Sequence, residues 1–148
     1  MLSNSIDQEI KSAMLAKDQA KLRGLRAIKA AFLLAKTEKG ASTDIDEETE
    51  IKLLQKLVKQ RKESADIYKS QGREDLFNIE QEEISVIEQY LPAQLSRDEI
   101  KVIIENIIQE MGGATQKEMG KVMGAANKAL AGKADGKLIA EIVKSLLS

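Results

Sequence analysis

The chain has 148 residues, of which 43% are hydrophobic and 32% charged, and its formal net charge is −1. It contains no cysteine and no histidine, which excludes disulfides, zinc–thiolate sites, thiolate nucleophiles and mechanisms that use an imidazole base. A single proline and only 3% aromatic residues favour helices over strands, so the composition predicts a globular, all-α protein.

The beginning of the chain does not resemble a signal peptide, because residues 1–10 carry Asp7 and Glu9 and contain no apolar run. The longest unbroken apolar stretch, residues 30–35, is far too short to cross a bilayer. We therefore expect a cytoplasmic protein that does not enter a membrane.

The first 91 residues predict four helices. We expect them over residues 6–17, over residues 18–39 up to Gly40, in a long segment that Gly72 ends, and from there to residue 91, before Pro92 turns the chain. Residues 41–46 read as a capped loop. The apolar positions that recur at helical spacing are Leu22, Leu25, Ile28, Phe32, Ile51, Leu54, Val58, Ala65, Tyr68, Ile84, Ile87 and Leu91.

The residues after Pro92 predict three further helices with clearer boundaries. Ser96 with Glu99, and Thr115 with Glu118, have the spacing of capping boxes, and Asp135 can cap the last helix. Glycines follow the first two apolar stripes. The sequence thus predicts a larger N-terminal helical bundle or hairpin domain, residues 1–92, and a small three-helix C-terminal domain, residues 96–148.

No catalytic centre can be recognised in the sequence. Glu80 with Glu83, or Glu47 with Glu50, could share a helix face and hold a hard cation, but nothing supplies the turn of a calcium loop. Serines that could act with a lysine lie in the middle of helices, where no oxyanion hole forms. We predict no catalytic residue, no metal site and no cofactor.

Basic residues gather near the C-terminus, where residues 115–148 hold six lysines against three acids. A helix start with free N–H groups and nearby lysines suits phosphate, so RNA is the predicted ligand of this region. Stacking aromatics are absent there, so RNA would be read through shape and phosphates. The candidate RNA-binding residues are Lys117, Lys121, Lys128, Lys133, Lys137, Gly120 and Gly124.

Each of these residues also has a plainer interpretation. Lys117, Lys121 and Lys128 step by four and seven and are expected on one helix face, where they could simply solubilise a small domain. Gly120 and Gly124 each cost about 1 kcal/mol inside a helix relative to alanine. Their spacing allows either a neighbouring helix or a phosphate backbone to come close, and we expect the neighbouring helix.

The sequence resembles the GatB/YqeY family. The resemblance is carried by Gly72-Arg73-Glu-Asp75-Leu76, Glu80, Tyr90-Leu91-Pro92, Gly120-Lys-Val122-Met123-Gly124 and Gly132-Lys-Ala134-Asp135-Gly136-Lys137. Because it covers essentially the whole chain, it implies a stand-alone member of that family. It also implies an all-α larger domain followed by a small three-helix domain.

The resemblance further implies a function. A similar module forms the tail of the B subunit of the tRNA-dependent amidotransferase, a carbon–nitrogen ligase that uses glutamine as amide donor, and helps to bind tRNA there. A tRNA-binding accessory module is therefore the first hypothesis, with tRNA-charging or amidotransferase proteins as further partners. A helical protein–protein adaptor without RNA binding, favoured by the acidic residues 44–50 and 74–90, and an amidotransferase acting on its own are the alternatives.

Overall fold

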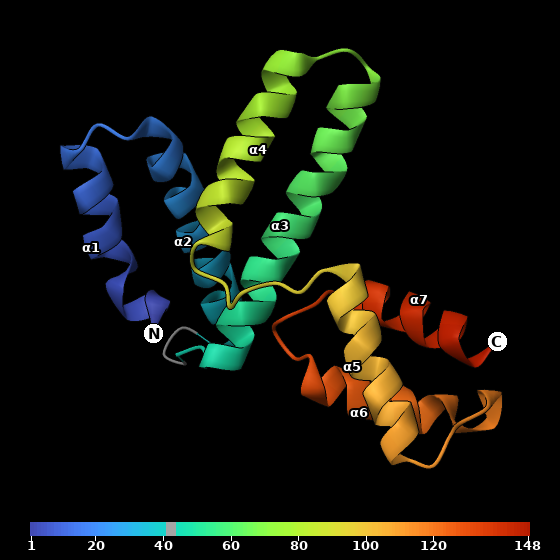
Figure 1. Ribbon diagram of the computed structural model, residues 1–148. Coiled ribbons are helices and arrows are strands. Elements are labelled where there is room, and N and C mark those ends of the chain that lie inside the picture. The colour runs from blue at the N-terminus through green and yellow to red at the C-terminus, as the bar shows by residue number, and fades with distance from the viewer. Residues whose placement is uncertain (41–43) are drawn as a thin grey trace. The chain divides into compact units, whose positions relative to one another are not determined.

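A computed structural model describes residues 1–40 and 44–148. Within these residues the chain forms seven α-helices and one 3-10 turn and contains no strand, which confirms the predicted all-α fold (Figure 1). The elements are α1 (Leu2–Leu15), α2 (Gln19–Lys39), α3 (Glu47–Ser70), α4 (Glu74–Glu88), α5 (Arg97–Glu110), η1 (Gln116–Glu118), α6 (Met119–Ala129) and α7 (Gly136–Leu147).

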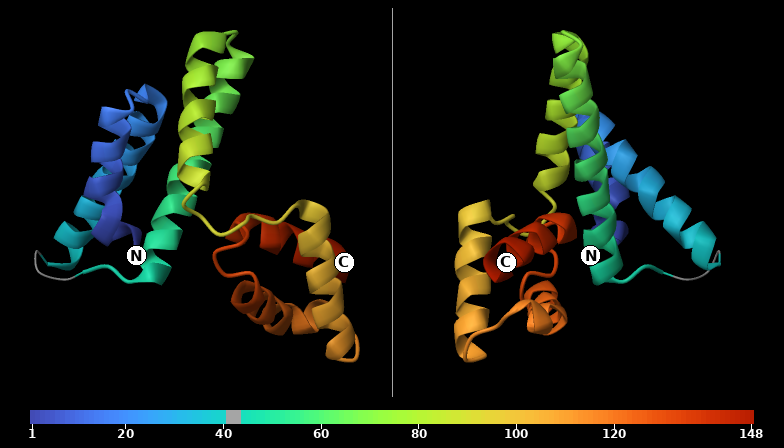
Figure 2. Two further views of the ribbon diagram at one scale, coloured as in Figure 1. Left: turned by 60° about the vertical axis from the view of Figure 1, so that its left-hand side comes forward. Right: turned by 90° about the vertical axis from the view of Figure 1, so that its right-hand side faces the viewer.

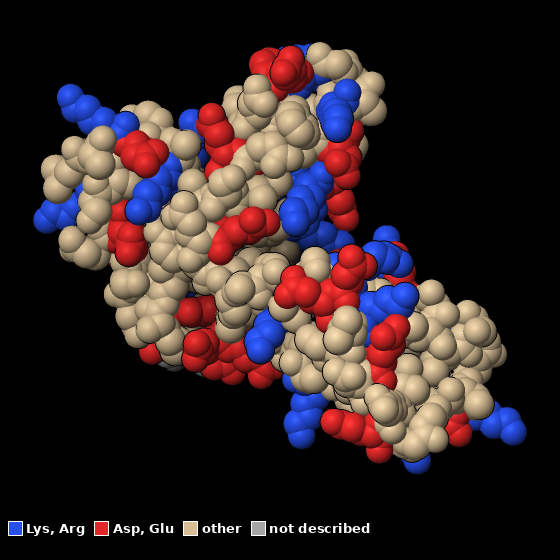
Figure 3. All heavy atoms as spheres, viewed as in Figure 1, with Lys and Arg blue, Asp and Glu red and all other residues tan. Residues whose placement is uncertain are grey.

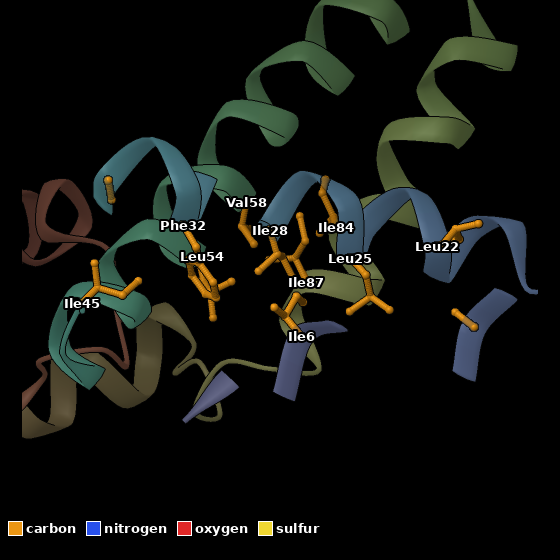
Figure 4. Packing of buried hydrophobic residues seen from close by; sticks show 12 residues of the cluster. Ile6, Leu22, Leu25, Ile28, Phe32, Ile45, Leu54, Val58, Ile84 and Ile87 are labelled. Carbon is orange, nitrogen blue, oxygen red and sulfur yellow. The ribbon is translucent and has the colours of Figure 1, made fainter. Parts of the chain in front are cut away.

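The chain divides into two compact units, residues 1–91 and 92–148. In unit 1, α1 and α2 form one antiparallel pair and α3 and α4 another (Figures 1 and 2). The buried side chains of all four helices meet in one hydrophobic core, which includes Leu25, Ile28, Leu54 and Ile87 (Figure 4). Most of the predicted apolar positions are buried there, whereas Ile51, Tyr68 and Leu91 are half-buried.

Polar contacts connect the helices of unit 1 around this core. Arg23 on α2 forms an ion pair with Glu82 on α4. Arg61 on α3 donates from Nε to Glu83 Oε2 at 3.1 Å. Tyr90, just after α4, donates its hydroxyl to Glu9 of α1 at 3.2 Å, and burial together with the Glu9 carboxylate raises the pKa of Tyr90 to about 12.

The helix ends in unit 1 differ from the predicted ones in two places. Helix α1 begins at Leu2, earlier than predicted, because Glu50 of α3 accepts the Ser3 N–H at 2.8 Å and so satisfies a donor that the first turn leaves free. Helix α4 ends at Glu88, since Gln89, Tyr90 and Leu91 donate i→i−3 hydrogen bonds in turn geometry before Pro92. Of the predicted loop 41–46, residues 41–43 lie outside the described residues.

Unit 2 has its own core, built from α5, α6 and α7. Both predicted capping boxes are present, Ser96 with Glu99 and Thr115 with Glu118, and Asp135 caps α7. The second box differs in one respect: it opens the 3-10 turn η1, and α6 starts after that turn. The buried members of the core are Ile100, Ile104, Val122, Ala126, Leu130, Ala134, Ile139, Ile142, Val143 and Leu147.

A fragment of residues 92–148 is expected to fold alone and to melt cooperatively, because its core is closed within the unit. A fragment of residues 96–148 should be less stable, since it lacks Leu95, which packs on that core and donates to Lys133 O at 2.9 Å. Circular dichroism melts of both fragments check this. A broad, non-cooperative melt of the longer fragment would contradict independent folding.

Candidate nucleic-acid interface

The five candidate lysines lie on one continuous stretch of unit 2, and all five side chains are exposed. Lys121 and Lys128 are on α6, Lys133 is in the turn that follows it, and Lys137 is in the first turn of α7. Lys117 lies in η1, outside α6. The expectation that Lys117 shares a helix face with Lys121 and Lys128 is therefore wrong, while Lys121 and Lys128, seven residues apart, do share one.

None of the five lysines forms an ion pair with a residue in the described ranges. The three acids of residues 115–148 are engaged elsewhere. Glu118 accepts from Thr115, and these bonds, followed by the nearby charge of Lys121, lower its pKa. Asp135 caps α7, and Glu141 pairs with Arg97 at 3.6 Å. The positive charge of this stretch is thus left for an external anion.

Gly120 and Gly124 lie on the exposed side of α6. Apart from the backbone of its own helix, no atom in the described part of the chain lies within 4 Å of where an alanine Cβ would stand at either glycine. The expectation that they pack against a neighbouring helix of the chain is therefore wrong. They leave a face of α6 almost without side chains between Lys121 and Lys128.

The turn between α6 and α7 brings Lys133 and Lys137 together in sequence and holds a defined shape. Gly132 has a φ of +76°, which favours glycine, and the Lys133 N–H donates to Leu130 O at 2.9 Å. Asp135 accepts the Lys137 N–H at 3.5 Å at the start of α7. The first turn of α7 thus has a capped N-terminus with a lysine on either side of the cap.

A residue that the sequence interpretation missed lies beside this turn. The Gln94 side chain donates to the carbonyl oxygens of Gly132 and of Pro92, each at 2.8 Å. Neither contact has a local sequence signal, because Gln94 lies in the segment before α5 and Gly132 follows α6.

The acidic pairs considered for a cation have other roles. Glu50 is buried against the start of α1, and Glu83 lies between Arg61 and Arg23. Burial, and then the charge of Glu83, raises the pKa of Glu80. Over residues 1–40 and 44–148 there is no cluster of three or more acidic side chains placed to hold a metal ion, and no helix long and apolar enough to cross a membrane.

Basic and acidic side chains alternate over much of the face of unit 1 seen in Figure 3. Many of them are paired. The acids of residues 74–90 that form ion pairs are Asp75 with Arg73, Glu82 with Arg23, Glu83 with Arg61 and Glu88 with Lys62. In residues 44–50, Asp44 pairs with Lys36 and Glu48 with Lys52. Most of the acidic charge of unit 1 is thus used inside the unit, unlike the lysine charge of unit 2.

Similar proteins carry two kinds of name. The chain is 30% identical over 140 residues to the Altered inheritance of mitochondria protein 41, mitochondrial, of Meyerozyma guilliermondii, covering 86% of this chain and 71% of that protein. The protein of the same name from Clavispora lusitaniae is 31% identical over 112 residues, 74% of this chain and 64% of its own. The chain thus spans about two thirds of the length of these relatives. Since their names place them in mitochondria, a cytoplasmic location for this chain stays a prediction.

A third relative is a Glutamyl-tRNA(Gln) amidotransferase subunit of Thermococcus sibiricus, which is 33% identical over 129 residues. The match covers 82% of this chain and 20% of that relative. A family model described as Yqey-like protein matches residues 3–147. The predicted family resemblance is confirmed, and the chain belongs to the YqeY-like protein family.

Proposed function

We propose that the chain is a tRNA-binding accessory module, with the RNA held by the surface that Lys117, Lys121, Lys128, Lys133 and Lys137 form together with Gly120 and Gly124. We refer to this surface as the lysine surface. The observation that carries the proposal is that all five lysines are exposed and form no ion pair with a described residue. Lysines placed in this way attract phosphates and release counterions when they bind.

Two further facts support this proposal. The open glycine face of α6 lets a phosphate backbone approach the helix between Lys121 and Lys128. A relative that matches most of this chain's length is part of an amidotransferase whose name contains Glutamyl-tRNA(Gln). We propose a binding role rather than a catalytic one, because the chain has neither cysteine nor histidine. Amidotransferase or tRNA-charging proteins are the proposed protein partners.

The adaptor hypothesis has weaker support. It relied on the acidic blocks of residues 44–50 and 74–90, and most of those carboxylates form ion pairs, helix caps or buried hydrogen bonds within unit 1. A surface whose charges are already compensated contributes little to the attraction of a charged partner.

Changing Lys121, Lys128 and Lys133 together to alanine is expected to weaken tRNA binding and its dependence on salt. Each lost phosphate contact lowers the slope of log affinity against log salt by about 0.7 to 0.9, so the slope should fall by about two to three. Gel-shift titrations with unfractionated tRNA at several salt concentrations measure this. The three lysines are exposed and unpaired, so the melting curve should change little.

The matched control carries alanine at Lys11, Lys56 and Lys69, three exposed lysines of unit 1 that lose the same charge and form no ion pair with a described residue. This variant should retain the wild-type slope. If the affinity and slope of the Lys121/Lys128/Lys133 variant also equal those of the wild type, the lysine surface is not the RNA site.

Alanine at Gly120 and Gly124 is expected to separate the fold from the binding. Both positions have room for a Cβ, so each change should stabilise α6 by up to about 1 kcal/mol and raise the melting temperature. A phosphate backbone that approaches this face would meet the new methyl groups, so tRNA affinity should fall in the more stable protein. Unchanged affinity would show that RNA does not come close to this face.

A further inference from the structure

We infer that Gln94 is a positioning residue for the lysine surface: its side-chain amide holds the turn between α6 and α7 in the conformation that presents Lys133. The inference rests on the proposed function for the ligand of Lys133, whereas the hold on the turn can be tested without any ligand.

Two consecutive carbonyl groups of the turn are held by two consecutive residues of the segment before α5. Gly132 O accepts from Gln94 Nε2 at 2.8 Å, and Lys133 O accepts from the backbone N–H of Leu95 at 2.9 Å. Leu95 itself packs against the core of unit 2. The peptide groups on both sides of the Lys133 Cα are therefore fixed to a segment that is anchored in the core.

Only a neutral amide suits the position of Gln94. The same Nε2 donates to Gly132 O and to Pro92 O, so both of its hydrogens are used. A glutamate has the same size but only acceptor oxygens when ionised, and it would place negative charge against two carbonyl groups. An alanine would leave both carbonyl groups to solvent.

The turn has little else to determine its shape. Gly132 is in the left-handed region at φ +76°, a conformation that glycine leaves easily, and Lys133 N–H to Leu130 O is the hydrogen bond that closes the turn after α6. The Lys133 side chain is exposed and has no contact with a described residue that would orient it. Its direction thus depends on the backbone that Gln94 and Leu95 hold.

The first experiment measures hydrogen exchange of the full chain without RNA, in the wild type and in Gln94→Ala and Gln94→Glu. Losing hydrogen bonds of ordinary net strength should raise the exchange rates of the Leu95 and Lys133 amides by about fivefold or more. Gln109→Glu, at an exposed position of α5, adds the same charge to unit 2 without touching the turn and should leave both rates unchanged. Equal rates in all four proteins would overturn the hold on the turn.

The second experiment measures binding of unfractionated tRNA by fluorescence anisotropy at several salt concentrations, for Gln94→Ala, Lys133→Ala and the double variant. Lys133→Ala should lower the salt slope by about one. If Gln94 acts through Lys133, Gln94→Ala should have a similar effect, and the double variant should be no weaker than Lys133→Ala alone. A purely structural role would instead give additive losses and an unchanged slope for Gln94→Ala.

The two experiments fail separately. Wild-type binding with the same affinity and slope in Gln94→Ala would overturn the positioning role. Absence of tRNA binding by the wild type would overturn the proposed function, and the exchange rates would then still support or overturn the hold of Gln94 on the turn.

Discussion

Replacing Gly24 by alanine should destabilise unit 1 by about 1–3 kcal/mol, the usual cost of forcing an extra carbon into a well-packed core. An alanine Cβ at this position would lie 2.6 Å from Val86 Cγ1 and 2.8 Å from Val86 Cβ. Both atoms are close to the backbone of α4, so the two helices would have to move apart. Gly24 is the point at which α2 comes close to α4.

Urea or thermal unfolding of Gly24→Ala measures the loss. The double variant with Val86→Ala should lose less than the sum of the two single changes, since it removes Cγ1 and keeps only the Cβ contact. Gly124→Ala is the matched control, because the same addition in α6 meets nothing in the described chain and should stabilise. Equal stability of Gly24→Ala and wild type would show that α2 and α4 can separate without cost.

The comparison of these glycines shows where sequence reasoning succeeds and where it stops. Gly24, Gly120 and Gly124 look alike in sequence, since each interrupts a helical pattern at a position where alanine would be the better helix former. What distinguishes them is the neighbour across the interface, Val86 for Gly24 and no described residue for the other two. A single sequence does not contain that pairing.

Local signals were, by contrast, sufficient for most of the fold. The caps at Ser96, Thr115 and Asp135 are interactions over two or three residues, and the structure has each of them. Helical spacing likewise identified most of the buried stripes of α2, α5, α6 and α7. Met111 was expected in the α5 stripe but is exposed, because it is the C-cap, where the helix period no longer applies.

The candidate site was predicted less completely, for the same reason. The lysines could be named from composition, and their exposure follows from their position on an amphipathic helix and a turn. Whether each lysine would find a carboxylate, and which residue holds the turn at Gly132, depends on contacts between distant segments. Gln94 and the ion pairs of the acidic blocks belong to that class.

Replacing Glu50 by alanine is expected to cost about 1.5–3 kcal/mol of stability, the range for a hydrogen bond to a charged group. The Glu50 side chain is 3% exposed although it is acidic, and its Oε1 accepts the Ser3 N–H at 2.8 Å. Helix α1 has no side-chain cap of its own, because Met1 is its N-cap residue. Glu50 therefore caps α1 from another helix, and its negative charge also suits the positive end of the helix dipole.

Two further variants separate the parts of this effect in urea unfolding. Glu50→Gln keeps an acceptor oxygen but not the charge, so it should lose less stability than Glu50→Ala. Glu47→Ala removes an exposed acid from the same first turn of α3 and controls for the dipole of α3 itself, worth about 0.3–1 kcal/mol. If Glu50→Ala lost no more than Glu47→Ala, the contact with Ser3 would not stabilise the fold. Hydrogen exchange should locate the loss, since the first-turn amides of α1 would exchange faster only when the cap at Glu50 is removed.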